Sequence, residues 1–191
     1  MKKPIAIIFN DTHLKPGNEN ELIISTKHMV EYALENKIER IIFAGDMFES
    51  RQFQRLSVLD AFDKILSLIA DAGLKLDMFP GNHDKTKYND SKSFLDVYRF
   101  HPNIKLHSHI SSLKIKGVSI TLLPFFSDDL LIPMIEKHNG SDILISHFEM
   151  AGSTNLGNIS EKTSINKKLL NKWKKVYLGH YHNHHEITKD I

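Results

Sequence analysis

The chain has 191 residues, and its 25 lysines and arginines against 23 aspartates and glutamates give a formal net charge of +2. Hydrophobic residues make up 41% and charged residues 25%, a balance that predicts one folded domain with a packed core and excludes wholesale disorder. Because the sequence contains no cysteine, disulfide scaffolds, thiolate zinc sites and cysteine nucleophiles are excluded. It contains 12 histidines, a residue type that commonly binds metals and transfers protons, so their placement is the main question.

The first half of the chain alternates between two hydrophobic periods. Short continuous apolar runs predict buried strands at 5–9, 41–44, 74–79 and 104–106. Apolar residues that recur every three or four positions predict helices at 22–34 and 56–69, and a shorter helix is expected at 93–100. Gly73 is expected to end the second of these helices. This order predicts an α/β fold in which helices connect parallel strands.

The second half of the chain adds a hairpin and further strands. Two apolar runs flank Lys116-Gly117, which predicts an antiparallel hairpin. The remaining elements are expected as a helix at 130–137, strands at 142–146 and 176–178, and a loop at 149–164. The lysine-rich segment 166–175 has two interpretations, an amphipathic helix with a solvated face or a contact to phosphate backbone. The hairpin within the alternation predicts a layered fold with mixed sheets.

Polar residues that can bind metals or transfer protons follow five of the predicted strands. They are Asp11, His13, Asp46, Asn82, His83, Asp84, His147, His180 and His182. One such residue alone would more often cap a helix or complete a turn. Five strand ends that all carry them are expected to meet at one edge, because ligands of open α/β sheets bind at the carboxyl ends of the strands.

These residue types are the ones that a pair of divalent metal ions requires. A carboxylate must bridge the two ions, and imidazoles and amide oxygens fill the other positions. Asp46 suits the bridge, since the glycine before it allows a close approach. Asp11 and His13 with a later histidine would complete one site, and Asn82 with two more histidines the other. His83 is left to act as a general acid.

Together, five separated motifs resemble those of the calcineurin-like metallophosphoesterases. They are Asp11-x-His13, Gly45-Asp46, Gly81-Asn82-His83-Asp84, His147 and Gly179-His180-x-His182. The resemblance extends from residue 5 to residue 185. It implies a layered α/β/β/α sandwich with mixed sheets and a metal site at the carboxyl ends of the strands.

The resemblance also implies a role for each site residue. The first metal would be held by Asp11, His13, Asp46 and His182, and the second by Asp46, Asn82, His147 and His180. The metals would be two divalent ions, manganese first, with iron, zinc or magnesium as alternatives. His83 would assist the leaving group, and we expect the Asp84 carboxylate to orient the His83 ring.

The residues directly after the catalytic histidine are candidates for substrate binding. Lys85, Lys87 and Tyr88 follow His83 and are placed to contact a phosphate or a base of the substrate. A structural role for these three side chains remains the alternative.

Within the superfamily, the local sequence is similar to the SbcD-type DNA repair and recombination nucleases. The similarity lies in residues 10–14, 43–48 and 81–84. It implies cleavage of DNA phosphodiesters with manganese beside an SMC-like coiled-coil ATPase subunit, and it leaves a homodimer open. The sequence departs from the family at Glu49, where a histidine is common, and in ending nine residues after His182. We therefore expect residues 1–191 to be a metallophosphoesterase catalytic domain that is either truncated or without the family's C-terminal cap domain.

Two other functions remain open. The same chemistry would serve a phosphodiesterase or phosphatase that acts on a small nucleotide or a phosphoprotein. A non-catalytic scaffold of the same fold is the second alternative, although such relatives lose ligands and every ligand position here is filled. Because neither a signal peptide nor a membrane-spanning run is visible, we expect no membrane association and a cytoplasmic location, in the host if the protein is viral.

Overall fold

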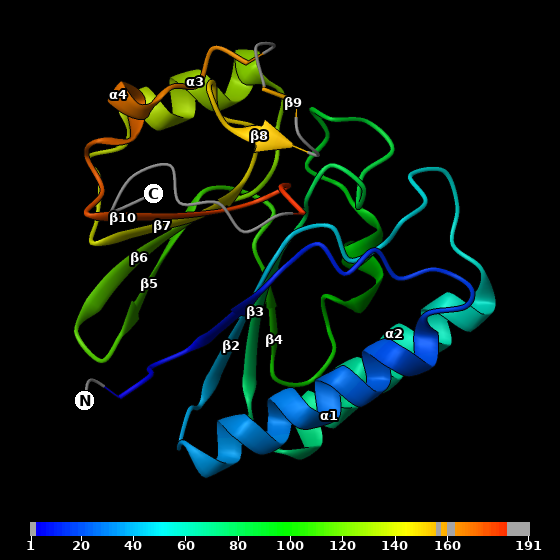
Figure 1. The fold of residues 1–191 in the computed structure, drawn as a ribbon. Coiled ribbons are helices and arrows are strands. Elements are labelled where there is room, and N and C mark those ends of the chain that lie inside the picture. The colour runs from blue at the N-terminus through cyan, green and yellow to red at the C-terminus, as the bar shows by residue number, and fades with distance from the viewer. Residues whose placement is uncertain (1–2, 156–157, 160–162, 183–191) are drawn as a thin grey trace.

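The computed structural model describes residues 3–155, 158–159 and 163–182 and contains two four-stranded sheets (Figure 1). The first sheet has the order β1 (Ile7–Phe9), β2 (Arg40–Ala44), β3 (Lys75–Phe79) and β4 (Ile104–Leu106), and all its pairs are parallel. The second has the order β10 (Lys175–Gly179), β7 (Ile143–His147), β6 (Val118–Leu123) and β5 (Ser111–Ile115). The β5–β6 hairpin is antiparallel and the other two pairs are parallel, so the second sheet is mixed.

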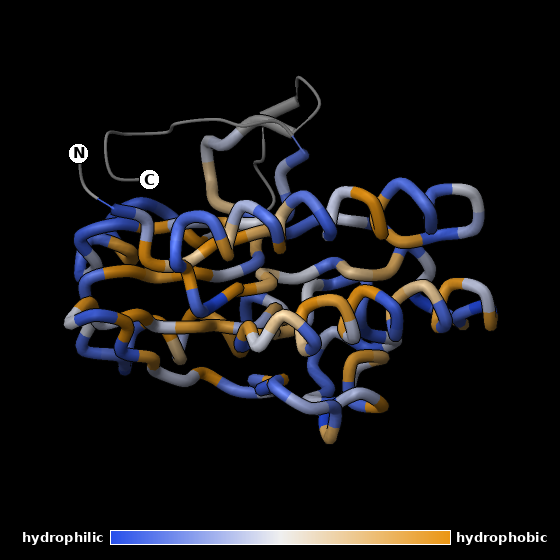
Figure 2. The backbone as a smooth tube through the Cα atoms, turned by 90° about the horizontal axis from the view of Figure 1, so that it is seen from below, coloured by the Kyte–Doolittle hydropathy of each residue, from blue (hydrophilic) through white to orange (hydrophobic). Residues whose placement is uncertain are grey.

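Helices cover the outer face of each sheet, which makes four layers (Figure 1). Helices α1 (Glu19–Glu35) and α2 (Leu56–Asp71) pack on the first sheet, and α3 (Asp128–Lys137) and α4 (Lys167–Leu170) on the second. Figure 2 shows hydrophobic and hydrophilic residues following each other turn by turn along the helices, as expected for helices with one buried face. The predicted α/β/β/α sandwich is confirmed.

Strand β2 shows why the apolar runs are continuous. Successive side chains of a strand point to opposite faces. Ile41 and Phe43 accordingly pack against the helices, whereas Ile42 and Ala44 pack between the two sheets. A strand buried on both faces therefore has few polar positions, and the first polar side chain after β2 is that of Asp46.

Two segments differ from the sequence expectation. The helix expected at 93–100 is a 3₁₀ turn, η1 (Phe94–Tyr98), in which Ser93 and Asp96 form a reciprocal capping box. The loop expected at 149–164 contains a short antiparallel pair, β8 (Thr154–Asn155) and β9 (Asn158–Ile159).

The lysine-rich segment 166–175 is helical only over the four residues of α4. The Lys172 Nζ donates hydrogen bonds to the carbonyls of Ile135 and His138, at 2.8 and 3.0 Å, at the end of α3. This lysine therefore satisfies carbonyls that the end of a helix leaves unpaired. Among the described residues, no helix is long and apolar enough to cross a bilayer.

Candidate metal centre

The carboxyl ends of strands from both sheets meet at one site. The site residues follow β1, β2 and β3 of the first sheet and end or follow β7 and β10 of the second. The two sheets are joined there by a hydrogen bond of 2.9 Å between His147 Nδ1 and the carbonyl of Ala44. This meeting point is where the sequence placed the candidate ligands.

Four of the site residues have left-handed backbones although none of them is glycine. The φ angles are 53° at Asp11, 45° at His13, 59° at Asp46 and 91° at His180. Such a conformation costs about 1–3 kcal/mol per residue and persists only where surrounding contacts enforce it. Here the loops after β1 and β2 hold each other, since the N–H groups of Asp11 and His13 donate to the carbonyls of Gly45 and Asp46 at 3.0 and 3.1 Å.

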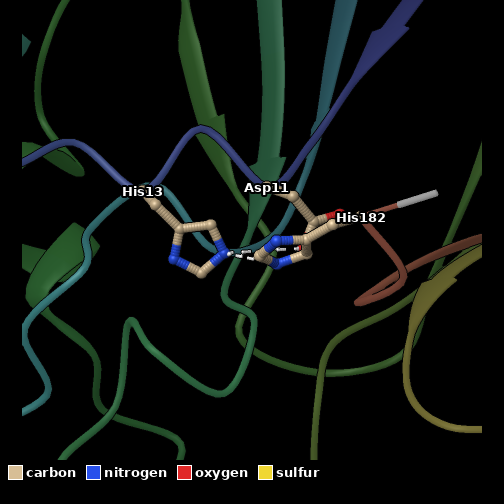
Figure 3. Close-up of side chains that lie close together, drawn as sticks. All are labelled: Asp11, His13 and His182. Atoms are coloured by element: carbon tan, nitrogen blue, oxygen red, sulfur yellow. Dashed lines mark hydrogen bonds and ion pairs between the residues drawn. The ribbon is translucent and has the colours of Figure 1, made fainter. Parts of the chain in front are cut away.

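The first group of candidate ligands comprises Asp11, His13 and His182 (Figure 3). Their ligand atoms lie within 4.8 Å of one another, and the two Nε2 atoms of His13 and His182 are 3.1 Å apart. The His13 Nε2 also lies 3.8 Å from Asp46 Oδ2. The structure thus brings together all four residues expected at the first metal.

The second group comprises Asp46, His147 and His180. The His147 Nε2 lies 3.1 Å from Asp46 Oδ2, and His180 Nδ1 lies 2.9 Å from Asn82 Oδ1. Asn82 is therefore the fourth member, as the sequence predicted. Asp46 lies beside both groups, which is the position that a bridging carboxylate requires.

The residues present fit a pair of divalent metals. Since a carbonyl only accepts, the His147 Nδ1 must carry the proton that it donates to Ala44, so Nε2 is the ring nitrogen available to a metal. That Nε2 is buried and makes no hydrogen bond of acceptable geometry within the described chain. A buried imidazole nitrogen of this kind, beside carboxylates and an amide oxygen, is the donor set of a first-row divalent ion.

Two glycines leave room for the ligands. A Cβ added at Gly45 or at Gly179 would lie 2.6 Å from His147 Nδ1. Real Cβ atoms do not approach a ring this closely, so a larger residue at either position would displace the histidine.

The charges of the site also suit metal binding. Burial alone would raise the pKa of Asp46, but the neighbouring His147 lowers it to about 2. Burial alone would lower the pKa of His147, but the carboxylates of Asp46 and Asp11 raise it to about 9. Burial lowers the pKa of His13 and of His180, which keeps these two rings neutral. The site therefore holds an ionised Asp46 carboxylate beside the neutral rings of His13 and His180, and His147 would release its Nε2 proton when a metal binds.

The expected contact between Asp84 and the His83 ring is wrong. The Asp84 carboxylate is buried and accepts hydrogen bonds from four backbone N–H groups in the loops after β2 and β3. The His83 Nδ1 instead lies 2.7 Å from the carbonyl of Glu49. Asp84 therefore stabilises the loops, while a backbone carbonyl orients the His83 ring.

The expected substrate contact of Lys85 is also wrong. The Lys85 side chain is fully buried, and its Nζ donates to the carbonyl of Phe125 at 2.5 Å and lies 3.8 Å from the ring centre of Phe126. Burial lowers the pKa of Lys85 to about 8. Lys87 and Tyr88, in contrast, are exposed.

Three residues near the site were not identified as site residues from the sequence. Glu49 lies 2.9 Å from His13, Glu149 lies 3.2 Å from His180, and Arg51 stacks on the ring of Tyr88 at 4.1 Å. Glu49 stood out only as a departure from the family pattern. Their position in the sequence could have identified all three, since each lies within five residues of a candidate ligand.

Comparisons with known proteins place the whole of this site in one family. The family model for calcineurin-like phosphoesterases matches residues 6–184. A curated relative, exonuclease subunit 1 of enterobacteria phage T4, is 24% identical over 160 residues, which are 82% of this chain. These residues make up 47% of the phage protein, so the chain spans about half the length of this relative.

Two solved structures are also similar. The nuclease MPE from Pseudomonas putida has a TM-score of 0.40 and 17% identity, over 62% of this chain and 52% of the other. A protein of unknown function from Aquifex aeolicus has a TM-score of 0.43 and 13% identity, over 83% of this chain and 82% of the other. The resemblance predicted from the five motifs is confirmed by the family model, which covers almost the entire chain. The chain belongs to the calcineurin-like phosphoesterase family.

Proposed function

We propose that the chain is a two-metal phosphodiester hydrolase that cleaves DNA. The observation that carries the proposal is the position of Asp46, which lies beside both groups of candidate ligands. Asp11, His13 and His182 complete one site with it, and Asn82, His147 and His180 complete the other. We propose Mn²⁺ as the metal from the similarity to the SbcD-type nucleases, since imidazole and carboxylate ligands also accept iron and zinc.

When bound, the two metals would supply Lewis-acid stabilisation of the phosphoryl oxygens and activation of water. The chain's own contribution is then proton transfer and orientation. Because the carbonyl of Glu49 only accepts, His83 Nδ1 carries a proton, and in the imidazolium form Nε2 carries a second one that it can transfer to the leaving oxygen, leaving the neutral ring. The His83 N–H donates to Asp46 Oδ1 at 2.8 Å, which fixes the acid relative to the ligand groups.

DNA is proposed as the substrate for two reasons. The phage relative is named as an exonuclease subunit. The chain also offers an exposed aromatic ring with a cation, five residues after His83 in the sequence, since Arg51 donates to the Tyr88 hydroxyl at 2.7 Å and stacks on its ring. An aromatic face with a neighbouring guanidinium suits a splayed base and its phosphate. The exposed Lys87 would add a phosphate contact.

A partner subunit follows from the same relative. Because the phage protein is named as a subunit, we propose that this chain also works beside a second protein, with an SMC-like ATPase as the candidate. Co-purification of the two chains and ATP-dependent stimulation of cleavage would test it.

The decisive experiment is Mn²⁺-dependent cleavage of linear duplex and single-stranded DNA, with a small aryl phosphodiester in parallel. Asp46→Asn should abolish cleavage, and His83→Ala should lose turnover while retaining Mn²⁺. DNA cleavage that requires both Mn²⁺ and Asp46 would support the proposal. Asp46-dependent hydrolysis of the aryl ester without action on DNA would instead indicate a small phosphodiester as substrate. Full activity in Asp46→Asn would refute the two-metal site.

A further inference from the structure

Each group of candidate ligands contains one histidine whose outer ring nitrogen meets a glutamate. In the first group, Glu49 Oε2 lies 2.9 Å from His13 Nδ1, a close ionic contact without the geometry of a hydrogen bond. In the second, Glu149 Oε1 lies 3.2 Å from His180 Nε2. The other ring nitrogen of each histidine faces the site: His13 Nε2 toward His182, and His180 Nδ1 toward Asn82. Each group thus has one carboxylate at the outer nitrogen of a histidine, as a hydrogen bond at His180 and as a close ionic contact at His13.

A carboxylate in this position determines which ring nitrogen carries the proton. An ionised carboxylate favours a proton on the nitrogen that faces it, through a hydrogen bond at His180 and through electrostatic attraction at His13, and the nitrogen facing the site then keeps its lone pair. The same contact fixes the ring orientation and makes the free nitrogen more basic, which strengthens a metal–imidazole bond. His13 uses Nδ1 for the carboxylate and His180 uses Nε2, so the two rings present different nitrogens to the site.

Each glutamate lies after one strand and contacts a histidine that follows the neighbouring strand. Glu49 follows Asp46 in the loop after β2 but contacts the histidine of the β1 loop. Its N–H donates to the carbonyl of Leu14 at 3.2 Å, which holds the two loops together. Glu149 follows the last residue of β7 but contacts His180 after β10. Each carboxylate therefore connects the loops of two ligands that the chain supplies separately.

We propose that Glu49 and Glu149 are positioning residues, one for each metal site, with Glu49 orienting His13 and Glu149 orienting His180. The inference rests on the proposed two-metal function and deepens it. Neither side chain is deeply buried, with exposed fractions of 44% and 37%, so either can be replaced without opening the core.

The test is calorimetric titration of the full chain with Mn²⁺ alone. Wild type should bind two ions. Glu49→Ala should weaken one site by about 10- to 100-fold, and Glu149→Ala should weaken the other by a similar factor. The double variant should weaken both. The Gln variants retain an accepting oxygen without the charge, so we expect them to recover part of the lost affinity. Glu31→Gln, on the exposed face of α1, removes a carboxylate far from the site and is the matched control.

Thermal unfolding without metal separates a folding defect from a positioning defect, and the variants should melt as wild type does. If both alanine variants bind two Mn²⁺ with wild-type affinity, the inference is wrong while the proposed function stands. Loss of affinity at the same site in both single variants would also overturn it, because each glutamate is assigned to a different site. If wild type binds no Mn²⁺, the proposed function fails and this inference fails with it.

Discussion

The Asp84 carboxylate accepts a hydrogen bond from the backbone N–H of Asp46 at 2.8 Å, so a buried acid holds the backbone of the candidate bridging ligand. It also accepts from Met47, Phe48 and Gly81, at 2.9, 3.1 and 2.9 Å. Burial and the nearby Asp46 carboxylate raise the pKa of Asp84 to about 7, against the backbone N–H groups, which lower it. The contact stabilises the left-handed conformation that Asp46 would otherwise avoid.

Asp84→Asn is expected to disrupt the site although it replaces none of the candidate ligands. The amide that replaces one oxygen would face backbone N–H donors, so at least one buried donor loses its acceptor. We expect a loss of about 1–3 kcal/mol in the free energy of unfolding, with weaker Mn²⁺ binding. Urea unfolding and Mn²⁺ titration measure the two effects. Unchanged values in both would contradict the role assigned to this side chain.

Gly45→Ala and Gly117→Ala form a matched pair. Their φ angles are 92° and 90°, so an alanine is equally strained at both. A Cβ at Gly45 would meet His147 at 2.6 Å, whereas nothing lies within 4 Å of one at Gly117. Both variants should lose about 1–2 kcal/mol of stability from the backbone alone. Only Gly45→Ala should lose Mn²⁺ binding and hydrolysis, and equal activity in the two variants would show that this close approach is unimportant.

Lys85→Met should change the stability of the protein, whereas Lys87→Met should change KM for DNA. Lys85 is buried against the Phe125 carbonyl and the Phe126 ring, so its loss should lower the free energy of unfolding by about 1–3 kcal/mol and leave KM unchanged. Lys87 is exposed, so its loss should raise KM for DNA and leave stability unchanged. Chemical denaturation and steady-state kinetics separate the two. A raised KM for Lys85→Met in a stable protein would restore the original expectation.

Arg51→Ala should weaken DNA binding more than Arg55→Ala. Arg51 is held on Tyr88, while Arg55 is an exposed residue immediately before α2. If the stacked pair receives a base and its phosphate, Arg51→Ala should cost about 1–3 kcal/mol of binding. Fluorescence anisotropy with a labelled single strand measures it. Equal affinities in the two variants would remove Arg51 from the substrate site.

Asp77 should make the protein's stability depend on acid pH. Burial alone would raise the pKa of Asp77, but the hydrogen bond from His107 at 2.7 Å and the ion pair with Arg40 hold it below its usual value of 3.8. Because the folded pKa is the lower one, this contribution is present above pH 3.8 and is lost as the pH falls toward the folded pKa. The free energy of unfolding should therefore decrease below pH 4 in wild type. Asp77→Asn should flatten that part of the curve, and an unaltered slope would contradict the assignment.

The layered fold and the ligand set could be predicted from the sequence because their determinants are local. Strands buried on both faces are mostly apolar, so polar residues at or just after their ends, such as Asp46 after β2 and His147 at the end of β7, stand out in the chain. Parallel strands bring such ends to the same edge of the sheet whatever the conformation of the loops. Of the two interpretations of segment 166–175, the helix forms only over Lys167–Leu170, and Lys172 caps a different helix, a contact that no local pattern records.

The burial and the contacts of the loop side chains depend on the tertiary structure alone. Lys85 and Lys87 are two residues apart and chemically alike, yet the path of the loop after β3 buries one and exposes the other. Asp84 contacts backbone amides supplied 36 to 38 residues earlier, and Glu149 contacts a histidine 31 residues later. The sequence by itself determined which residue types reach the site, because strand periodicity is local. Which atoms face one another was decided only when separate loops packed, because hydrogen bonds between loops depend on partners distant in the chain.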